Sequence, residues 1–160
     1  MNVPRRRPPW LVSAVATVAV LAGLVVGVPP AAAAPVEVCS LDLSTGAYSC
    51  STDAGAARPT VEASSTTLLA RLYDAPNRSV ADGYLDIFAA GPCDTAPDVD
   101  WQVGVMPPGW NDRISSFQGF SECDVRLWQN GGFSGASYGP ATSANSLGAM
   151  DNQTSSMTFA

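Results

Sequence analysis

A succession of short β-rich runs, each followed by Gly, Pro, Asn or Asp, constrains the fold of this chain most. From residue 68 onward no window keeps a helical period beyond about two turns, so the pattern favours strands. Short strands between regular turn signals are typical of a β-sandwich or barrel. The expected strands are 68–73, 83–88, 100–105, 115–120, 125–128, 135–138 and 155–159.

The first 34 residues have the three parts of an export signal. Three arginines at 5–7 supply the charge, residues 11–28 form an uncharged apolar run, and alanines precede a cut after Ala33 or Ala34. An uncleaved anchor is the alternative, because the run reaches the ~18 residues that a membrane span needs. We expect cleavage and secretion, which would leave the mature chain without a membrane segment.

Residues 35–67 are predicted to form an N-terminal hairpin and a linker. Residues 36–43 alternate in the manner of a strand, a turn follows at 44–46, and a second short strand follows at 47–50. Residues 51–67 are rich in Ala, Ser and Thr, as in a linker. The main domain is then expected over residues 68–160.

All four cysteines lie beyond the export signal, and an even number in an exported chain indicates two disulfides. Three pairings are possible, and we favour Cys39–Cys50 and Cys93–Cys123. The first would close the hairpin, and the second would tie two elements of the main domain. A zinc site is the alternative, but the chain has no C-x-x-C pair and no histidine.

The composition of the mature part excludes several function classes. It has five arginines, no lysine and 14 acidic residues, so its net charge is −9. This charge argues against nucleic acid and against anionic membrane surfaces. Without histidine there is no imidazole base and no Ser–His–Asp triad. Asp98 and Asp100 are interpreted as turn carboxylates, so we expect no enzyme.

The main domain repeats itself. Residues 71–73 (Arg-Leu-Tyr) match residues 126–128 (Arg-Leu-Trp). Further on, residues 111–117 match residues 151–157, each with an Asn/Asp pair, two variable residues, two serines and an apolar residue. The longer first half has its extra residues around 91–97, which we interpret as a loop held by a disulfide.

The repeated residues resemble the βγ-crystallin family. Its Greek-key unit has an aromatic residue, a second one five positions on and a glycine two further, as at Trp128, Phe133 and Gly135. The first half has Arg78 and Val80 at those positions and departs from the pattern. The resemblance implies an all-β, βγ-crystallin-like Greek-key sandwich of two four-stranded motifs, about 68–122 and 123–160, after a short disulfide-closed hairpin.

The same resemblance implies a calcium site, since the repeated six residues match the family's Asn/Asp-Asn/Asp-x-x-Ser/Thr-Ser motif. Two loops of this kind together hold up to two ions. Carbonyls near the second and third motif residues and the first serine hydroxyl would coordinate, while the second serine would hold the loop. The implied metal residues are Asn111, Asp112, Arg113, Ser115, Asp151, Asn152, Gln153 and Ser155. Few carboxylates predict weak sites, roughly 10⁻⁵ to 10⁻³ M.

Two other interpretations compete with the calcium module. Both loops could be Asx-type turns that bind nothing. Alternatively, the protein could inhibit a secreted protease, because streptomycete metalloproteinase inhibitors are small secreted proteins with a crystallin-like fold; loop 91–100 or 105–109 would then enter the protease. We expect a monomer whose partners are calcium ions and, beyond them, a secreted protease or a cell-surface component.

Eight aromatic side chains at strand positions are expected in the core. They are Tyr73, Phe88, Trp101, Phe117, Phe120, Trp128, Phe133 and Phe159. Trp110, just before the first motif, is expected to cover its loop.

Overall fold

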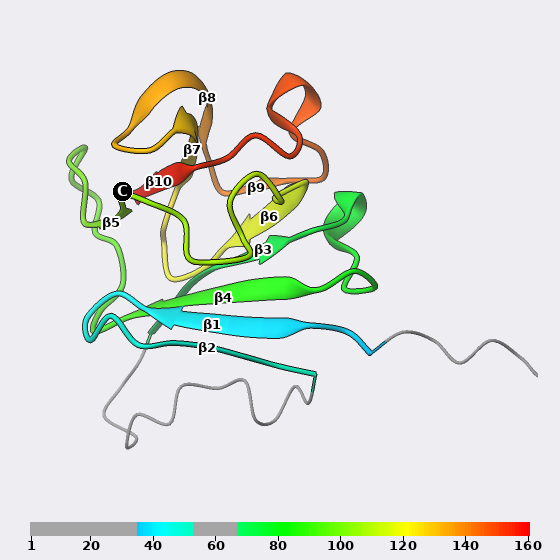
Figure 1. Ribbon diagram of the computed structural model, residues 1–160. Helices are drawn as coiled ribbons and strands as arrows, with labels where there is room; N and C mark the ends of the chain where they lie inside the picture. Colours follow the sequence, from blue (N-terminus) through cyan, green and yellow to red (C-terminus); the bar gives the residue numbers. More distant parts are fainter. Residues whose placement is uncertain (1–34, 53–66) are drawn as a thin grey trace, which may run out of the picture. The chain divides into compact units, whose positions relative to one another are not determined.

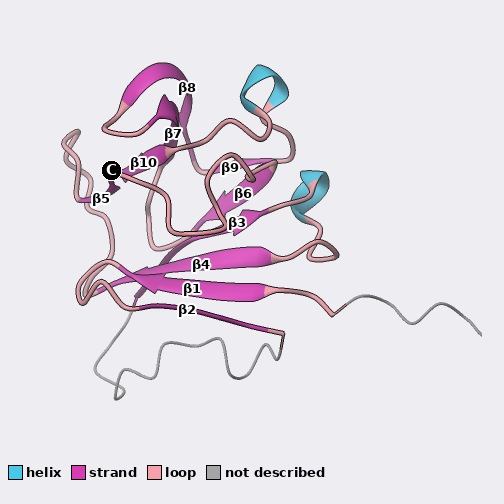
Figure 2. Cartoon of the chain, viewed as in Figure 1, coloured by secondary structure: helices cyan, strands magenta, loops and turns pink. Residues whose placement is uncertain are grey.

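The computed structural model describes residues 35–52 and 67–160, and its strands form two sheets (Figure 1). The predicted export signal and most of the predicted linker lie outside the described residues. Two short 3₁₀ turns interrupt the strands (Figure 2). The elements are β1 Val38–Asp42, β2 Tyr48–Ser51, β3 Thr67–Tyr73, η1 Pro76–Arg78, β4 Tyr84–Ala89, β5 Trp101–Val103, β6 Ser116–Gly119, β7 Val125–Asn130, β8 Ser134–Ala141, β9 Ser143–Ala144, η2 Gly148–Met150 and β10 Ser156–Phe159.

These elements confirm the predicted all-β class. Each strand expected from the sequence is present, with ends that differ by a few residues. The two-residue strand β9 was not predicted, because Ser143 and Ala144 carry no β-forming side-chain pattern. Its strand geometry comes from pairing with β6.

The two halves of the repeat interlock by exchanging one strand each. In the first half, the first strand β3 lies between the second strand β4 and the fourth strand β6. In the second half, the first strand β7 lies in the same way between the second strand β8 and the fourth strand β10. A fourth strand beside the first is the Greek-key arrangement. The third strands cross over, so that β5 pairs with β10 and β9 pairs with β6. Each sheet is therefore completed by a strand of the other half.

The N-terminal hairpin extends the first sheet. β1 pairs antiparallel with β2 and parallel with β4, which gives the sheet order β2-β1-β4-β3-β6-β9 (Figure 1). The buried carboxylate of Asp42 accepts hydrogen bonds from the amides of Ser44 and Thr45 at 2.8 and 3.4 Å and so begins the turn. The hairpin and both halves belong to one compact unit.

Both disulfides have the favoured pairing. Cys39 and Cys50 face each other across the hairpin, and Cys93 joins the loop after β4 to Cys123, just before β7. The second bond therefore ties the long loop of the first half to the start of the second half. Two disulfides in a small β domain fit an extracellular protein.

One hydrophobic core fills the space between the sheets. In β4 the inward residues Leu85, Ile87 and Ala89 alternate with partly exposed ones, as expected for a strand with one buried face. The core also takes side chains from β3, β6, β7 and β10. Its largest fully buried members are Trp110, Phe117, Phe159, Leu69, Leu72, Leu85, Ile87, Ile114, Leu127, Met157 and Val125.

The aromatic predictions were partly wrong. Tyr73, Phe117 and Phe159 are buried, whereas Phe120 lies just after β6 and is 38% exposed. Phe88, Trp101, Trp128 and Phe133 are only partly buried; Phe88 points away from the core because its neighbours in β4 point into it. Trp110 is a core residue and does more than cover a loop. The described residues include no helix long and apolar enough to cross a membrane.

Candidate metal centre

The two predicted motif loops have the same backbone form. Each leaves a tight turn and enters a buried strand, β6 or β10. The second motif residue has a left-handed backbone in both, with φ of 56° at Asp112 and 53° at Asn152. Asp and Asn adopt this conformation more readily than other side chains do, which explains why they stand there.

The loops cross and hold each other. The amide of Asp112 donates to the carbonyl of Thr154, and the amide of Asn152 donates to the carbonyl of Ile114, both at 3.0 Å. Ile114 and Thr154 occupy the same position in their motifs and are fully buried. The crossing therefore fixes each loop against the other through the backbone.

The same crossing brings polar oxygens of the two motifs together in pairs. The hydroxyl of Ser155 lies 3.4 Å from Oδ1 of Asp112, and the hydroxyl of Ser115 lies 3.4 Å from Oδ1 of Asn152. We call these the Asp112 pair and the Asn152 pair. Each combines the second residue of one motif with the first serine of the other.

These oxygens are ligands of the type that calcium prefers. Among the described residues, no backbone amide donates to the carbonyl oxygens of Asp112, Arg113, Asn152 or Gln153, so these four remain available as well. The donor set therefore fits a hard cation. It also has little charge, because the Asp112 pair contains one carboxylate and the Asn152 pair contains none.

The first motif residues lie at the exposed rim of the centre. The side-chain amide of Asn111 donates to Oδ2 of Asp112 at 2.7 Å and so orients that carboxylate. Asp151 has the equivalent place in the second loop and is exposed. The two acidic residues of the motifs therefore stand at different positions, and the two pairs are not equivalent.

The second serines connect each loop to the β-hairpin of its own half. The buried hydroxyl of Ser116 donates to Ala75 O at 2.6 Å and accepts from the Arg78 amide at 3.0 Å. In the second half, Ser156 makes the same contacts to Asn130 O and the Phe133 amide. The first half thus keeps this hairpin connection although it lacks the aromatic residue and the glycine of the pattern.

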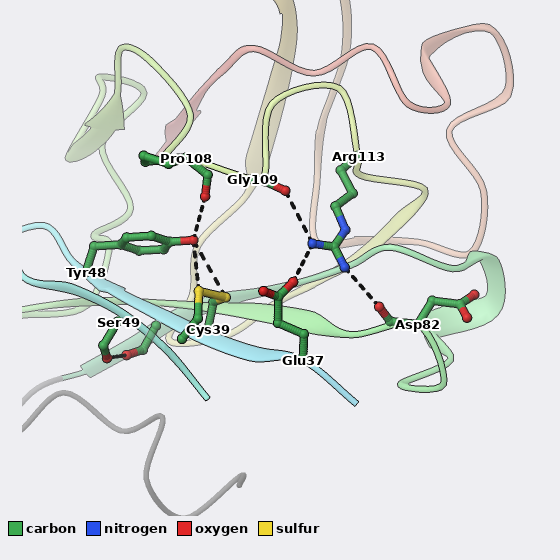
Figure 3. The surroundings of a disulfide bond; sticks show 10 residues. Glu37, Cys39, Tyr48, Ser49, Asp82, Pro108, Gly109 and Arg113 are labelled. Carbon is green, nitrogen blue, oxygen red and sulfur yellow. Dashed lines mark hydrogen bonds and ion pairs between the residues drawn. A yellow bond between two sulfur atoms is a disulfide. The ribbon is translucent and has the colours of Figure 1, made fainter. Parts of the chain in front are cut away.

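The third motif residues turn their side chains away from the centre. Arg113 donates from Nε to Asp74 at 2.7 Å. It also donates from Nη1 to Glu37 at 2.5 Å and to Gly109 O at 3.3 Å, and from Nη2 to Asp82 O at 3.1 Å (Figure 3). Burial lowers the pKa of Arg113, but the hydrogen bonds that it donates to Asp74 and Glu37 outweigh this effect and hold the pKa above its usual value.

Gln153 occupies the same position in the second loop without a charge. Its side-chain amide nitrogen donates to Ala149 O, and its side-chain oxygen accepts from the side chain of Gln129, both at 2.8 Å. Both third residues therefore leave their backbone carbonyls, and not their side chains, near the centre.

The N-terminal hairpin also contacts the approach to the first loop (Figure 3). The hydroxyl of Tyr48 donates to Pro108 O at 2.8 Å and lies 2.9 Å from the sulfur of Cys50. Burial, with the nearby charge of Glu37, raises the pKa of Tyr48, which keeps the hydroxyl protonated as a donor. Glu37 and Tyr48 were not among the predicted site residues, because contacts between residues 76 and 60 positions apart have no local signal in the sequence.

One other group of potential metal ligands lies in the described part of the chain. Glu37, Cys39 and Cys50 have ligand atoms within 4.8 Å of one another. Both sulfurs belong to the disulfide, so neither offers the thiolate that a metal would bind. The crossed loops remain the stronger candidate.

Comparisons with known proteins give one structural likeness. No family model and no curated protein matches the chain. A solved structure described as "Evolution of the eye lens beta-gamma-crystallin domain fold" is 18% identical, with 62% of this chain and 92% of that chain covered and a TM-score of 0.42. This likeness concerns the fold alone.

Proposed function

We propose that this crystallin-like chain is a secreted, non-enzymatic module whose fold is stabilised by calcium held between its two motif loops. The observation that carries the proposal is the crossing of the loops, which pairs Asp112 with Ser155 and Asn152 with Ser115. A ligand that binds only the folded state stabilises it by mass action. Up to two ions would bind weakly, in the range of ~10⁻⁵ to 10⁻³ M that few carboxylates give.

The export signal that the sequence predicts and the two disulfides support secretion. The absence of histidine from the sequence and the single carboxylate in the two pairs support a binding role over catalysis. With no imidazole, acid–base chemistry would depend on carboxylates, and the Asp112 pair contains a single one.

Alanine at both Ser115 and Ser155 tests the site. The double variant removes one hydroxyl ligand from each pair and leaves the backbone crossing in place, so the disulfide-intact mature protein should fold and fail to bind calcium. Isothermal titration with calcium measures the loss. Ser134→Ala is the matched control, since among the described residues the exposed Ser134 hydroxyl makes one hydrogen bond, to Gly131 O at 3.3 Å.

Undiminished calcium binding by the double variant would refute this assignment. Binding by neither the variant nor the wild type would leave the loops as Asx-type turns.

Protease inhibition is the second candidate, and the loop between β4 and β5 favours it. Its residues 94–99 are exposed, while Cys93 is buried in the disulfide to Cys123. Within the loop, the Ala96 amide donates to Asp94 at 2.7 Å and the Asp94 amide to Asp100 at 3.2 Å. An exposed loop held in this way suits entry into a protease cleft, because little order is lost on binding.

Stoichiometric inhibition of a secreted metalloproteinase that is lost when residues 95–98 are replaced by Gly and Ser would support the second candidate. The Ser115/Ser155 double variant should inhibit normally in that case. No inhibition at micromolar protein would exclude this role for that class of protease.

A further inference from the structure

The N-terminal hairpin contacts the first motif loop at Arg113 and the segment that leads into this loop at Pro108. Glu37, one residue before β1, forms an ion pair with Arg113, the third residue of the motif. Tyr48, in β2, donates a hydrogen bond to Pro108 O, five residues before Arg113. The hairpin's disulfide lies between these contacts, with its sulfurs next to the Tyr48 hydroxyl (Figure 3).

The second loop lacks such a partner among the described residues. Gln153 is held by Gln129 and Ala149 of its own half, without an ion pair. The repeat therefore differs at this point: the first loop has a cation at the third position and an added hairpin that neutralises it. Asp74 supplies a second carboxylate to the same guanidinium at 2.7 Å.

The charge around Arg113 and the direction of its side chain both reduce repulsion between the guanidinium and a cation at the centre. Its carbonyl belongs to the candidate centre, so an uncompensated guanidinium on the same residue would repel a bound cation. The side chain lies over the ring of buried Trp110, 4.8 Å from its centroid, which fixes the direction in which it leaves the loop. Glu37, which belongs to the N-terminal hairpin and not to the repeat, binds the guanidinium at this position.

We propose that the disulfide-closed hairpin is a clamp on the first motif loop, and that Arg113 is the positioning residue through which it acts. The clamp holds the loop in its crossed form before any ion arrives and directs the guanidinium away from the centre. The effect of the clamp on calcium affinity rests on the proposed function, whereas its effect on the conformation of the loop does not. A hairpin that merely extends the sheet would stabilise both loops alike.

Amide hydrogen exchange of the mature protein in EDTA tests the clamp without metal. Glu37→Gln removes one charge from the contact, and Glu122→Gln is the matched control, since exposed Glu122 makes no ion pair among the described residues. The Asp112 amide reports on the first loop and the Phe133 amide on the second half. We expect Glu37→Gln to speed exchange at Asp112 roughly two- to fivefold, as for a partly exposed ion pair, and to leave Phe133 unchanged.

Two further variants show whether the effect passes through the named contacts. In an Arg113→Gln background, Glu37→Gln should have no additional effect at Asp112, because the partner charge is gone. Tyr48→Phe, which removes the hydroxyl that donates to Pro108 O and lies next to the disulfide sulfurs, should also speed exchange at Asp112. Equal changes at Asp112 and Phe133, or none in either variant, would overturn the clamp.

Calcium titration separates the clamp from the proposed function. We expect Glu37→Gln to weaken binding of one ion roughly two- to fivefold, while Glu122→Gln leaves it unchanged. Faster exchange at Asp112 in a protein that binds no calcium would sustain the clamp and refute the proposed function. Normal calcium binding together with wild-type exchange in Glu37→Gln would refute the clamp and sustain the proposed function.

Discussion

At the scale of the residue, the second serine of each motif is expected to matter for stability more than for metal. Ser156 is fully buried, donates to Asn130 O at 2.6 Å and accepts from the Phe133 amide at 3.0 Å. Ser156→Ala leaves both backbone groups without this partner, so the free energy of unfolding should fall by about 1–3 kcal/mol. Urea denaturation in EDTA measures the loss, and Ser134→Ala should change it by less than about 0.5 kcal/mol. A wild-type value for Ser156→Ala would contradict this role.

Removal of the Thr154 hydroxyl is expected to have the opposite effect on stability. Thr154 is fully buried and its Oγ1 has no hydrogen-bond partner among the described residues, whereas its counterpart in the first motif is the apolar Ile114. Thr154→Val keeps the shape and removes the unpaired polar group, so stability should rise by about 1 kcal/mol. The midpoint of urea unfolding measures the gain, and a decrease would mean that the hydroxyl has a partner in the folded protein.

At the scale of the element, the two loops are predicted to bind calcium unequally. The Asp112 pair contains a carboxylate and the Asn152 pair an amide. Because ligand charge tunes affinity, Asn152→Asp should tighten the weaker site roughly tenfold, and Asp112→Asn should weaken the stronger site to a similar degree. Isothermal titration distinguishes the two steps. Asp151→Asn is the control, and an equal effect from it would mean that overall charge, and not the pair, sets the affinity.

The elements also show which features the sequence could reveal. Alternating side chains and turn residues predicted the strands because these signals are local. The repeat predicted both motif loops because each has its whole pattern within six residues. Strand β9, the parallel pairing of β1 with β4 and the contact of Glu37 with Arg113 depend on partners far along the chain, so no local pattern contains them.

The exchange of strands between the halves could not be predicted from the sequence, because it too depends on partners far along the chain. Residues 101–103 read as one more strand of the first half, yet β5 pairs with β10 in the other sheet. Only the packing of both halves around one core decides this pairing. Arg78 and Val80 depart from the Greek-key pattern of an aromatic residue and a glycine, yet the first hairpin keeps its connection. Ser116 accepts a hydrogen bond from this hairpin, as Ser156 does from the second.

At the scale of the whole molecule, the two disulfides are expected to contribute unequally. Cys93–Cys123 closes a span of 30 residues and Cys39–Cys50 a span of 11. In the chain-entropy description, these closures stabilise the fold by about 3.6 and 2.8 kcal/mol respectively. Replacing Cys93 and Cys123 together by alanine should therefore lower the denaturation midpoint more than replacing Cys39 and Cys50. The reverse order would show that the hairpin contributes more to the fold than its span implies.

The interlocked halves also determine how calcium would act on the whole molecule. Each pair takes one oxygen from each motif, and each sheet takes one strand from the other half. An ion at either pair would therefore join the two halves, and its binding energy would oppose global unfolding.

The thermal midpoint of the mature, disulfide-intact protein, measured in EDTA and then in millimolar calcium with magnesium as the control, tests the central claim most directly. We expect calcium to raise the midpoint by several degrees and magnesium to raise it far less, since magnesium requires a stricter geometry and keeps its water. An unchanged midpoint in calcium, or an equal rise in magnesium, would contradict the proposal that the crossed loops hold calcium.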